Sequence, residues 1–400
     1  MSTPTPKPWG IIEKNVQKRF IYYLKHSIGT IDWCGGQGMN PHHLYINAFN
    51  LLPQIGPRRM ARLLKFFGDP AEAWRAPGSA LLGAGLEEHI VVQILEHRGQ
   101  IDPENEYEKL LRQKIQPIIL DEDSYPPLLR EIPDPPAILY IRGELRPRDQ
   151  NGIAIVGSRK FTPYGKQVAF DLARDLTRAG LTINSGLALG IDAIAHHSAL
   201  EHAGRTIAVL ASGVDGIYPA NNRMLAEKII AGQGAVISEL PLGTPPLKHH
   251  FPTRNRIIAG LSLGTVVVEA AVESGALITA SHALEQNRQV FAVPGSIYSP
   301  SSAGPNNLIK MGAKPVMAAN DVLEELNLNE LVAETLKEEV LGDNDEEQKI
   351  LSSLSRQPRH FDEIAKLTGL PSPTIAAQLT IMEMKGKIRN LGANQYVKAR

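Results

Sequence analysis

Residues 152–165 read GIAIVGSRKFTPYG and point to the architecture of the chain. Residues 153–156 are a continuous apolar run, typical of a parallel strand that is buried on both faces. Gly157, Ser158 and Arg159 then lead into a helical pattern. A glycine turn between a strand and a helix presents backbone N–H groups that suit a phosphate, although a purely structural turn would look the same. The stretch predicts an α/β unit with a candidate anion-binding turn.

Short β-branched runs alternate with helical stretches along the central part of the chain. They lie at residues 182–184, 206–210, 235–238, 265–268 and 289–293. Because helical stretches separate them, we predict an extended Rossmann-like parallel sheet, covered on both faces, within residues 116–326. The turn at Gly157 is no dinucleotide fingerprint, because G-x-G-x-x-G is absent. Nor is it a Walker A loop, since Gln167 stands where Ser or Thr would hold magnesium.

The residues on the N-terminal side of this sheet domain have a different sequence pattern. Residues 1–44 are predicted to be an extension, with a short helix at residues 11–25. Residues 45–115 show apolar residues three and four apart, which predicts a small all-α domain of the SAM/helix-hairpin-helix-like kind. Residues 52–64 resemble the helix-hairpin-helix motif. Gln54 replaces its usual first glycine, so phosphate binding and a structural role both stay open.

On the C-terminal side, we predict an acidic linker at residues 327–347 and a winged-helix domain at residues 348–400. The winged helix is indicated by three helical stretches followed by a hairpin. These are residues 350–354, 361–367 and 372–384, and then residues 387–397. The fold class is therefore α/β, with a Rossmann-like sheet flanked by an all-α domain and a winged helix.

Charge is distributed unevenly, although 42 Lys and Arg balance 42 Asp and Glu. The basic and acidic residues number 18 and 18 in residues 1–150, 14 and 10 in residues 151–320, 1 and 11 in residues 321–347, and 9 and 3 in residues 348–400. Two basic modules are thus separated by an acidic segment, and a polyanionic partner is not excluded. One cysteine, Cys34, can form no intrachain disulfide. With no targeting or membrane-spanning segment in the sequence, we expect a cytoplasmic protein.

A second glycine turn, SGLALGID at residues 185–192, follows the next predicted strand. Glycine turns on neighbouring parallel strands form the crevice where open α/β sheets bind ligands. Asp192 and His196 lie one helical turn apart and could bind a metal. Asp192 is more simply explained by its position near a helix start, where it complements the dipole. We therefore expect no metal site.

The most informative stretch is KHHFPTRNRIIA at residues 248–259. Cations bind phosphates, and an exposed phenylalanine offers a stacking face to an unpaired base. A helix starting at Pro252 would direct its free N–H groups to the same place. We interpret the stretch as a single-stranded nucleic-acid site rather than a solvated basic face. In the stretch ESGA, residues 273–276, close packing explains Ser274 better than nucleophilic chemistry.

Several phrases taken together resemble the DNA-processing protein A (DprA/Smf) family of bacteria. They are VGSR (156–159), SGLALGID (185–192), YP (218–219), FPTRNRIIAG (251–260), ESGA (273–276) and VPG (293–295). The resemblance implies single-stranded DNA binding in a basic pocket and a homodimer. It also implies that the protein protects incoming DNA during natural transformation. The resemblance further implies that the protein loads the RecA recombinase on this DNA. No catalysis and no cofactor are implied.

By position, the resemblance implies that Arg159 and Lys248 hold phosphates and that Phe251 packs against or stacks on a nucleotide. It also implies the other residues of the DNA-binding pocket. These are Ser158, Gly186, Arg254, Asn255, Arg256 and Gly275.

Two alternatives from other classes remain open. A Rossmann-like nucleotide phosphoribohydrolase, of the lysine-decarboxylase-like kind, would use a glutamate placed like Glu269 after the strand at residues 265–268. Its Pro-Gly-Gly-x-Gly-Thr run is reduced here to Leu263-Gly264-Thr265. A nucleotide-sensing winged-helix regulator would rest on the C-terminal domain alone. The sequence favours a binding protein over an enzyme.

Overall fold

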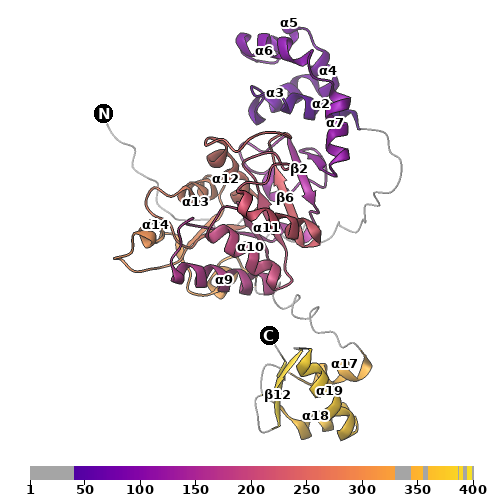
Figure 1. Cartoon of the computed structure of the whole chain (residues 1–400), viewed down its shortest axis with the longest axis vertical. Helices are drawn as coiled ribbons and strands as arrows, with labels where there is room; N and C mark the ends of the chain where they lie inside the picture. Colours follow the sequence, from indigo (N-terminus) through magenta and orange to yellow (C-terminus); the bar gives the residue numbers. More distant parts are fainter. Residues whose placement is uncertain (1–39, 329–343, 355–358, 386, 391–393, 399–400) are drawn as a thin grey trace. The chain divides into compact units, whose positions relative to one another are not determined.

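The computed structural model describes residues 40–328, 344–354, 359–385, 387–390 and 394–398 (Figure 1). The predicted helix at residues 11–25, Cys34 and most of the acidic segment lie outside these ranges. The described chain forms two compact units. The first takes in residues up to Val322 except Arg178–Gly180, and the second the residues from Leu323 onward. Within the described ranges, every helix is too short or too polar to cross a membrane.

A run of short helices opens the described part of the first unit. They are α2 (Pro41–Asn50), α3 (Pro57–Phe67), α4 (Pro70–Arg75), α5 (Gly78–Gly83), α6 (Glu88–Arg98) and α7 (Pro103–Arg112). Proline begins four of them, where its missing N–H needs no partner and its φ is preset. The side chains of Asn40, Asp69 and Asp102 accept hydrogen bonds from first-turn amides of α2, α4 and α7.

One central sheet follows the helices, in the strand order β1-β2-β6-β5-β4-β3-β7-β8-β9. Its strands are β1 (Gln116–Ile119), β2 (Ile138–Gly143), β3 (Gly152–Val156), β4 (Thr182–Ser185), β5 (Thr206–Val209), β6 (Gly234–Ser238), β7 (Gly264–Val267), β8 (Gln289–Ala292) and β9 (Lys314–Pro315). Pairing is parallel from β6 to β9. The predicted Rossmann-like α/β class is therefore confirmed.

The sequence did not predict β1 and β2, which add an antiparallel edge to the sheet. Pro117 within β1 and the prolines just before β2 hide the strand pattern. Proline is tolerated there because β1 is an edge strand with one unpaired side. The helical domain packs on this edge. Tyr140 of β2 is fully buried, its hydroxyl donates to Asn47 Oδ1 (2.7 Å), and it accepts from Asn50 Nδ2 (3.1 Å).

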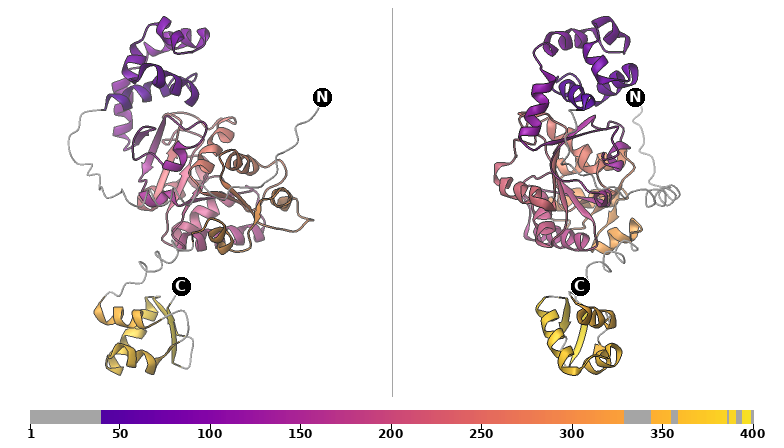
Figure 2. Two further views of the ribbon diagram at one scale, coloured as in Figure 1. Left: turned by 180° about the vertical axis from the view of Figure 1, so that it is seen from behind. Right: turned by 90° about the vertical axis from the view of Figure 1, so that its right-hand side faces the viewer.

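Helices cover both faces of the sheet (Figure 2). They are α8 (Pro127–Arg130), α9 (Pro163–Arg178), α10 (Ile191–Glu201), α11 (Arg223–Lys228), α12 (His250–Gly260), α13 (Gly275–Glu285), α14 (Ala303–Lys310) and α15 (Ala319–Glu325). Four short segments lie between these helices and the strands: η1 (Pro147–Gln150), η2 (Ala220–Asn222), η3 (Ile229–Gln233) and η4 (Pro300–Ser302). Alternate β5 residues face opposite layers: Ile207 and Val209 pack in the core that includes residues of α12 and α13, and Ala208 packs in the core that includes residues of α11.

Among its described residues from 344 onward, the second unit contains three helices and a small antiparallel sheet. The elements are α17 (Asp345–Ser353), β10 (Arg359–His360), α18 (Phe361–Thr368), α19 (Ser372–Met384), β11 (Ile388–Asn390) and β12 (Gln395–Lys398), with strand order β10-β12-β11. Ile350, Ile364 and Ile375, one from each helix, are fully buried in a shared core. This is the arrangement of a winged helix-turn-helix, as predicted from the C-terminal sequence.

Candidate nucleic-acid interface

The carboxyl ends of the parallel strands β3 and β4 lie side by side, and a glycine turn follows each. The two turns pack against each other, because the amide of Ile191 donates to the carbonyl of Ser158 (3.2 Å). Gly190 has φ +88°, and a Cβ there would lie 2.3 Å from the Ser158 carbonyl oxygen. Only glycine fits this crossing. The predicted juxtaposition of two glycine turns is present in the structure.

Glu269, directly after Val268, fixes both ends of the loop at residues 157–162. Its backbone carbonyl accepts from the Ser158 amide (2.6 Å), and its carboxylate accepts from the amide (2.9 Å) and hydroxyl (2.6 Å) of Thr162. The Ser301 hydroxyl also donates to the carboxylate (3.2 Å). Glu269 is 1% exposed. The carboxylate considered for the hydrolase alternative is thus engaged in holding this loop.

The loop presents its cations to solvent. The Ser158 hydroxyl donates to the carbonyl of Lys160 (2.7 Å) and accepts from the Lys160 amide (3.0 Å), so this side chain is used within the turn. Arg159 and Lys160 are exposed. Ser158 therefore shapes the loop, and Arg159 is available to a ligand.

Phe251 lies at the centre of a cluster of aromatic and cationic side chains. The Arg159 guanidinium carbon is 5.5 Å from the ring centroid, within cation–π range. The Tyr218 ring meets Phe251 edge-on at 5.9 Å between centroids and is 45% exposed. Lys248, three residues before Phe251, is also exposed. We call Arg159, Tyr218, Lys248 and Phe251 the Phe251 site.

Sequence reasoning did not identify Tyr218 as a site residue. Tyr218 follows β5, far in sequence from both glycine turns and from Phe251. In the sequence, Tyr218 was marked only by the Tyr218-Pro219 pair, one of the short motifs that resemble the family. The spatial reason is that β5 lies next to β4 in the sheet, so the loop after β5 reaches the same edge.

The helix that carries Phe251 begins at His250, so the predicted start at Pro252 was wrong. A proline in the first turn of a helix forfeits no intrahelical hydrogen bond, because amides in that turn have no partner. The helix can therefore start two residues earlier. Phe251 is consequently held on the first turn of α12 rather than in a loop.

Arg254, predicted as a pocket residue, is only 5% exposed and points inward. Its guanidinium donates to the Gly186 carbonyl (2.8 Å) and to the Val209 carbonyl. Burial lowers the pKa of Arg254 to about 10, and the nearby Asp192 carboxylate opposes this shift. Asp192 accepts from the Gly186 amide (3.0 Å), and burial raises its pKa. Arg254 and Asp192 thus hold the second glycine turn from both sides.

Asn255 and Arg256 are buried as well. Asn255 donates to the Gly275 carbonyl (3.2 Å) and accepts from Arg254 Nε (3.1 Å), which links α12 to the start of α13. Arg256 pairs with the half-buried Glu239, and desolvation raises the pKa of this carboxyl. Arg159 and Lys248 are therefore exposed cations of this region, and Phe251 beside them is half-buried. The side chains of Arg254, Asn255 and Arg256 are engaged beneath them.

The close approach at Gly186 gives a stability prediction. A Cβ there would lie 2.6 Å from Arg254 Nη2, so Gly186→Ala is expected to displace this guanidinium. Overpacking of this kind costs about 1–3 kcal/mol, which urea unfolding measures. Gly275→Ala is the matched control, because no atom lies within 4 Å of its Cβ position. Equal stability of the two variants would contradict the packing seen at Gly186.

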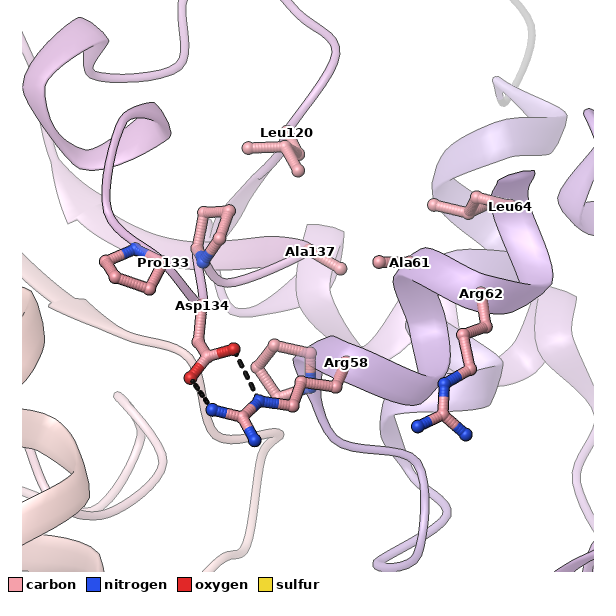
Figure 3. A pocket seen from close by; sticks show the side chains of 10 residues that line it. Arg58, Ala61, Arg62, Leu64, Leu120, Pro133, Asp134 and Ala137 are labelled. Carbon is pink, nitrogen blue, oxygen red and sulfur yellow. Dashed lines mark hydrogen bonds and ion pairs between the residues drawn. The ribbon is translucent and has the colours of Figure 1, made fainter. Parts of the chain in front are cut away.

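The region of the helix-hairpin-helix resemblance contains a cavity of about 300 Å³ between α3 and residues 133–137 (Figure 3). Arg58 faces Asp134 across its opening and forms a bidentate pair, with Nε–Oδ1 2.7 Å and Nη2–Oδ2 2.8 Å. This pairing neutralises a cation that a phosphate would need. Whether the turn amides of this motif bind a phosphate stays a prediction.

Comparisons with known proteins give consistent matches. Residues 116–327 match the family model described as DNA recombination-mediator protein A, and residues 318–394 match the DprA winged helix domain. Protein Smf of Synechocystis is 36% identical over 89% of this chain and 99% of its own length. DNA processing protein DprA of Bacillus subtilis is 47% identical over 54% of this chain and 72% of its own length. The X-ray structure of DprA from Streptococcus pneumoniae matches with a TM-score of 0.63 and 36% identity, covering 72% of this chain and 99% of that one.

Proposed function

Because this chain belongs to the DNA recombination-mediator protein A family, we propose that it binds single-stranded DNA at the Phe251 site. The observation that carries the proposal is the accessible cation, Arg159, placed 5.5 Å from the ring of Phe251. A cation beside an aromatic face is the combination that proteins use for an unpaired strand, since one binds phosphate and the other stacks on a base. We propose this as a binding function, without a catalytic step.

The same geometry predicts a preference for single-stranded over double-stranded DNA. Phe251 and Tyr218 offer ring surface only to a base that has left its helical stack. In a duplex the bases are paired and stacked, so only the phosphate contacts of Arg159 and Lys248 would remain. Every base has a π face, and the binding should therefore tolerate any sequence.

The finer role that we propose is protection of incoming single-stranded DNA and loading of the RecA recombinase during natural transformation. Support comes from the family's description as a recombination mediator. A small site on phosphates and a few bases would leave the rest of the strand open to a recombinase. We also propose a homodimer, because two Phe251 sites on one strand would raise the affinity through their effective concentration.

The phosphate contacts can be tested by salt dependence. We expect Arg159→Ala and Lys248→Ala each to weaken binding of all single-stranded sequences. Each should also reduce the slope of log affinity against log salt by about 0.7, the value for one phosphate on a single strand. Fluorescence anisotropy at several salt concentrations measures both quantities. Arg112→Ala is a control, because this exposed arginine pairs with Glu108 on α7. An unchanged slope in both variants would show that the phosphates bind elsewhere.

A further inference from the structure

A second cavity borders the loop at residues 157–162, where Thr162 lines it. Its volume is about 390 Å³, within the range of about 300–1,000 Å³ that small-molecule sites occupy. We call it the serine pocket, and its lining residues are Thr162, Tyr164, Glu269, Gly295, Ser296, Ser299 and Ser302. These residues follow β3, β7 and β8, whose carboxyl ends are at the same sheet edge as those of β4 and β5. One loop thus borders both sites.

The chemistry of the serine pocket excludes a phosphate and suits a neutral, hydrogen-bonding group. No lysine or arginine is among its lining residues, and the Glu269 carboxylate would repel an anion. The Glu269 carboxylate is used by Thr162 and Ser301, so the serine hydroxyls are the groups left to a ligand. The hydroxyls of Ser296 and Ser299 can donate or accept. Amino, imino and carbonyl groups of nucleobases are suitable partners for these hydroxyls.

Two exposed tyrosines, Tyr164 and Tyr298, lie in or near the segments that form the serine pocket. Tyr164 is 49% exposed, and its hydroxyl donates to the Pro294 carbonyl (2.8 Å), which fixes the ring next to the pocket. Tyr298, in the loop that carries Ser296 and Ser299, is 90% exposed. Aromatic faces of this kind stack on bases of any identity.

The phosphates of a bound single strand would be contacted by cations outside the serine pocket. Arg159 and Lys160 are exposed on the loop that borders the serine pocket and the Phe251 site. A strand crossing this loop would have its backbone beside these cations and a base on either side. A free nucleotide would instead need a cation inside the pocket, and the lining contains none.

We infer that the serine pocket receives one base of the same single strand that occupies the Phe251 site. The Tyr164 ring stacks on this base, and the exposed Ser296 hydroxyl forms a hydrogen bond with its edge. The inference rests on the proposed function and extends it, because it gives the bound strand a path across the loop at residues 157–162.

Binding of a length series of single-stranded oligonucleotides to the full-length chain tests this inference. With wild type, affinity should rise once an oligonucleotide is long enough to cross the loop. Tyr164→Ala should remove this rise, lowering affinity for long oligonucleotides about 5- to 150-fold, the loss expected for one stacked base. Ser296→Leu, which replaces an exposed residue and fills the pocket, should do the same. Neither variant should change the affinity for oligonucleotides that reach only the Phe251 site.

Tyr164→Phe is the matched control, since it keeps the ring and should bind within about twofold of wild type. The inference is overturned if Ser296→Leu binds oligonucleotides of all lengths as wild type does. This holds even if Tyr164→Ala weakens binding, because that variant could also disturb the loop. It is also overturned if free dGMP binds wild type, is lost in Ser296→Leu, and the length dependence is unchanged. Failure of wild type to bind any oligonucleotide would instead refute the proposed function.

Discussion

Replacing Arg254 by leucine is expected to lower the free energy of unfolding by about 3–5 kcal/mol and to abolish single-stranded DNA binding. The substitution leaves the buried Asp192 carboxylate without its neighbouring cation. It also leaves the carbonyls of Gly186 and Val209 without their donor. Since these groups hold the second glycine turn, on which Ser158 and the first turn rest, the effect should reach Arg159. Urea unfolding and oligonucleotide binding measure the two effects.

Two variants separate this role from a direct DNA contact. Arg254→Lys keeps the charge near Asp192 and loses part of the hydrogen bonding, so its loss of stability should be smaller. Arg159→Ala removes an exposed side chain and should unfold within about 0.5 kcal/mol of wild type. If Arg254→Leu were as stable as wild type and merely reduced the salt slope, Arg254 would be a phosphate ligand after all.

Phe251→Ala is expected to weaken single-stranded DNA binding by about 1–3 kcal/mol, or about 5- to 150-fold. The ring provides stacking surface and carries no charge, so the slope against salt should stay at the wild-type value. This pattern is the opposite of that expected for Arg159→Ala. Anisotropy titrations of both variants over the same salt series distinguish stacking from phosphate binding.

Phe251→Trp is the control for the ring, because it keeps an aromatic face and should retain most of the affinity, whereas Phe251→Leu keeps only apolar bulk. Tyr218→Ala should show a smaller loss of the same kind, since Tyr218 meets Phe251 edge-on. Wild-type affinity in Phe251→Ala would show that this ring only packs against its neighbours.

Much of the fold could be predicted from the sequence because the central strands have a clear physical signature. Residues 153–156 and 266–268 are continuous apolar runs, as a parallel strand covered on both faces requires. The edge strands β1 and β2 lack this signature, since proline interrupts their surroundings. The cluster at Tyr218 could not be predicted by position, because the strand order that brings β5 beside β4 is a tertiary property.

The sequence pattern also could not predict which side chains of α12 are buried and which are exposed. Arg254 to Gly260 are buried without interruption, so no periodic polar face marks which cations reach solvent. Counting charge in residues 151–320 therefore overstates the basic surface, since Arg254 and Arg256 are included in the sum but are buried. In the structure Arg159, Lys160 and Lys248 are exposed, and Arg159 lies beside the Phe251 ring.

The most direct test is the affinity of the full-length chain for a single-stranded oligonucleotide and for the duplex of the same length and sequence. Both affinities are measured by anisotropy under the same salt conditions. We expect the single strand to bind at least about tenfold more tightly, a difference of about 1.4 kcal/mol that one stacked base can supply. We also expect Phe251→Ala to remove most of this preference. Equal or tighter binding of the duplex, or a preference that persists in Phe251→Ala, would contradict single-strand recognition at the Phe251 site.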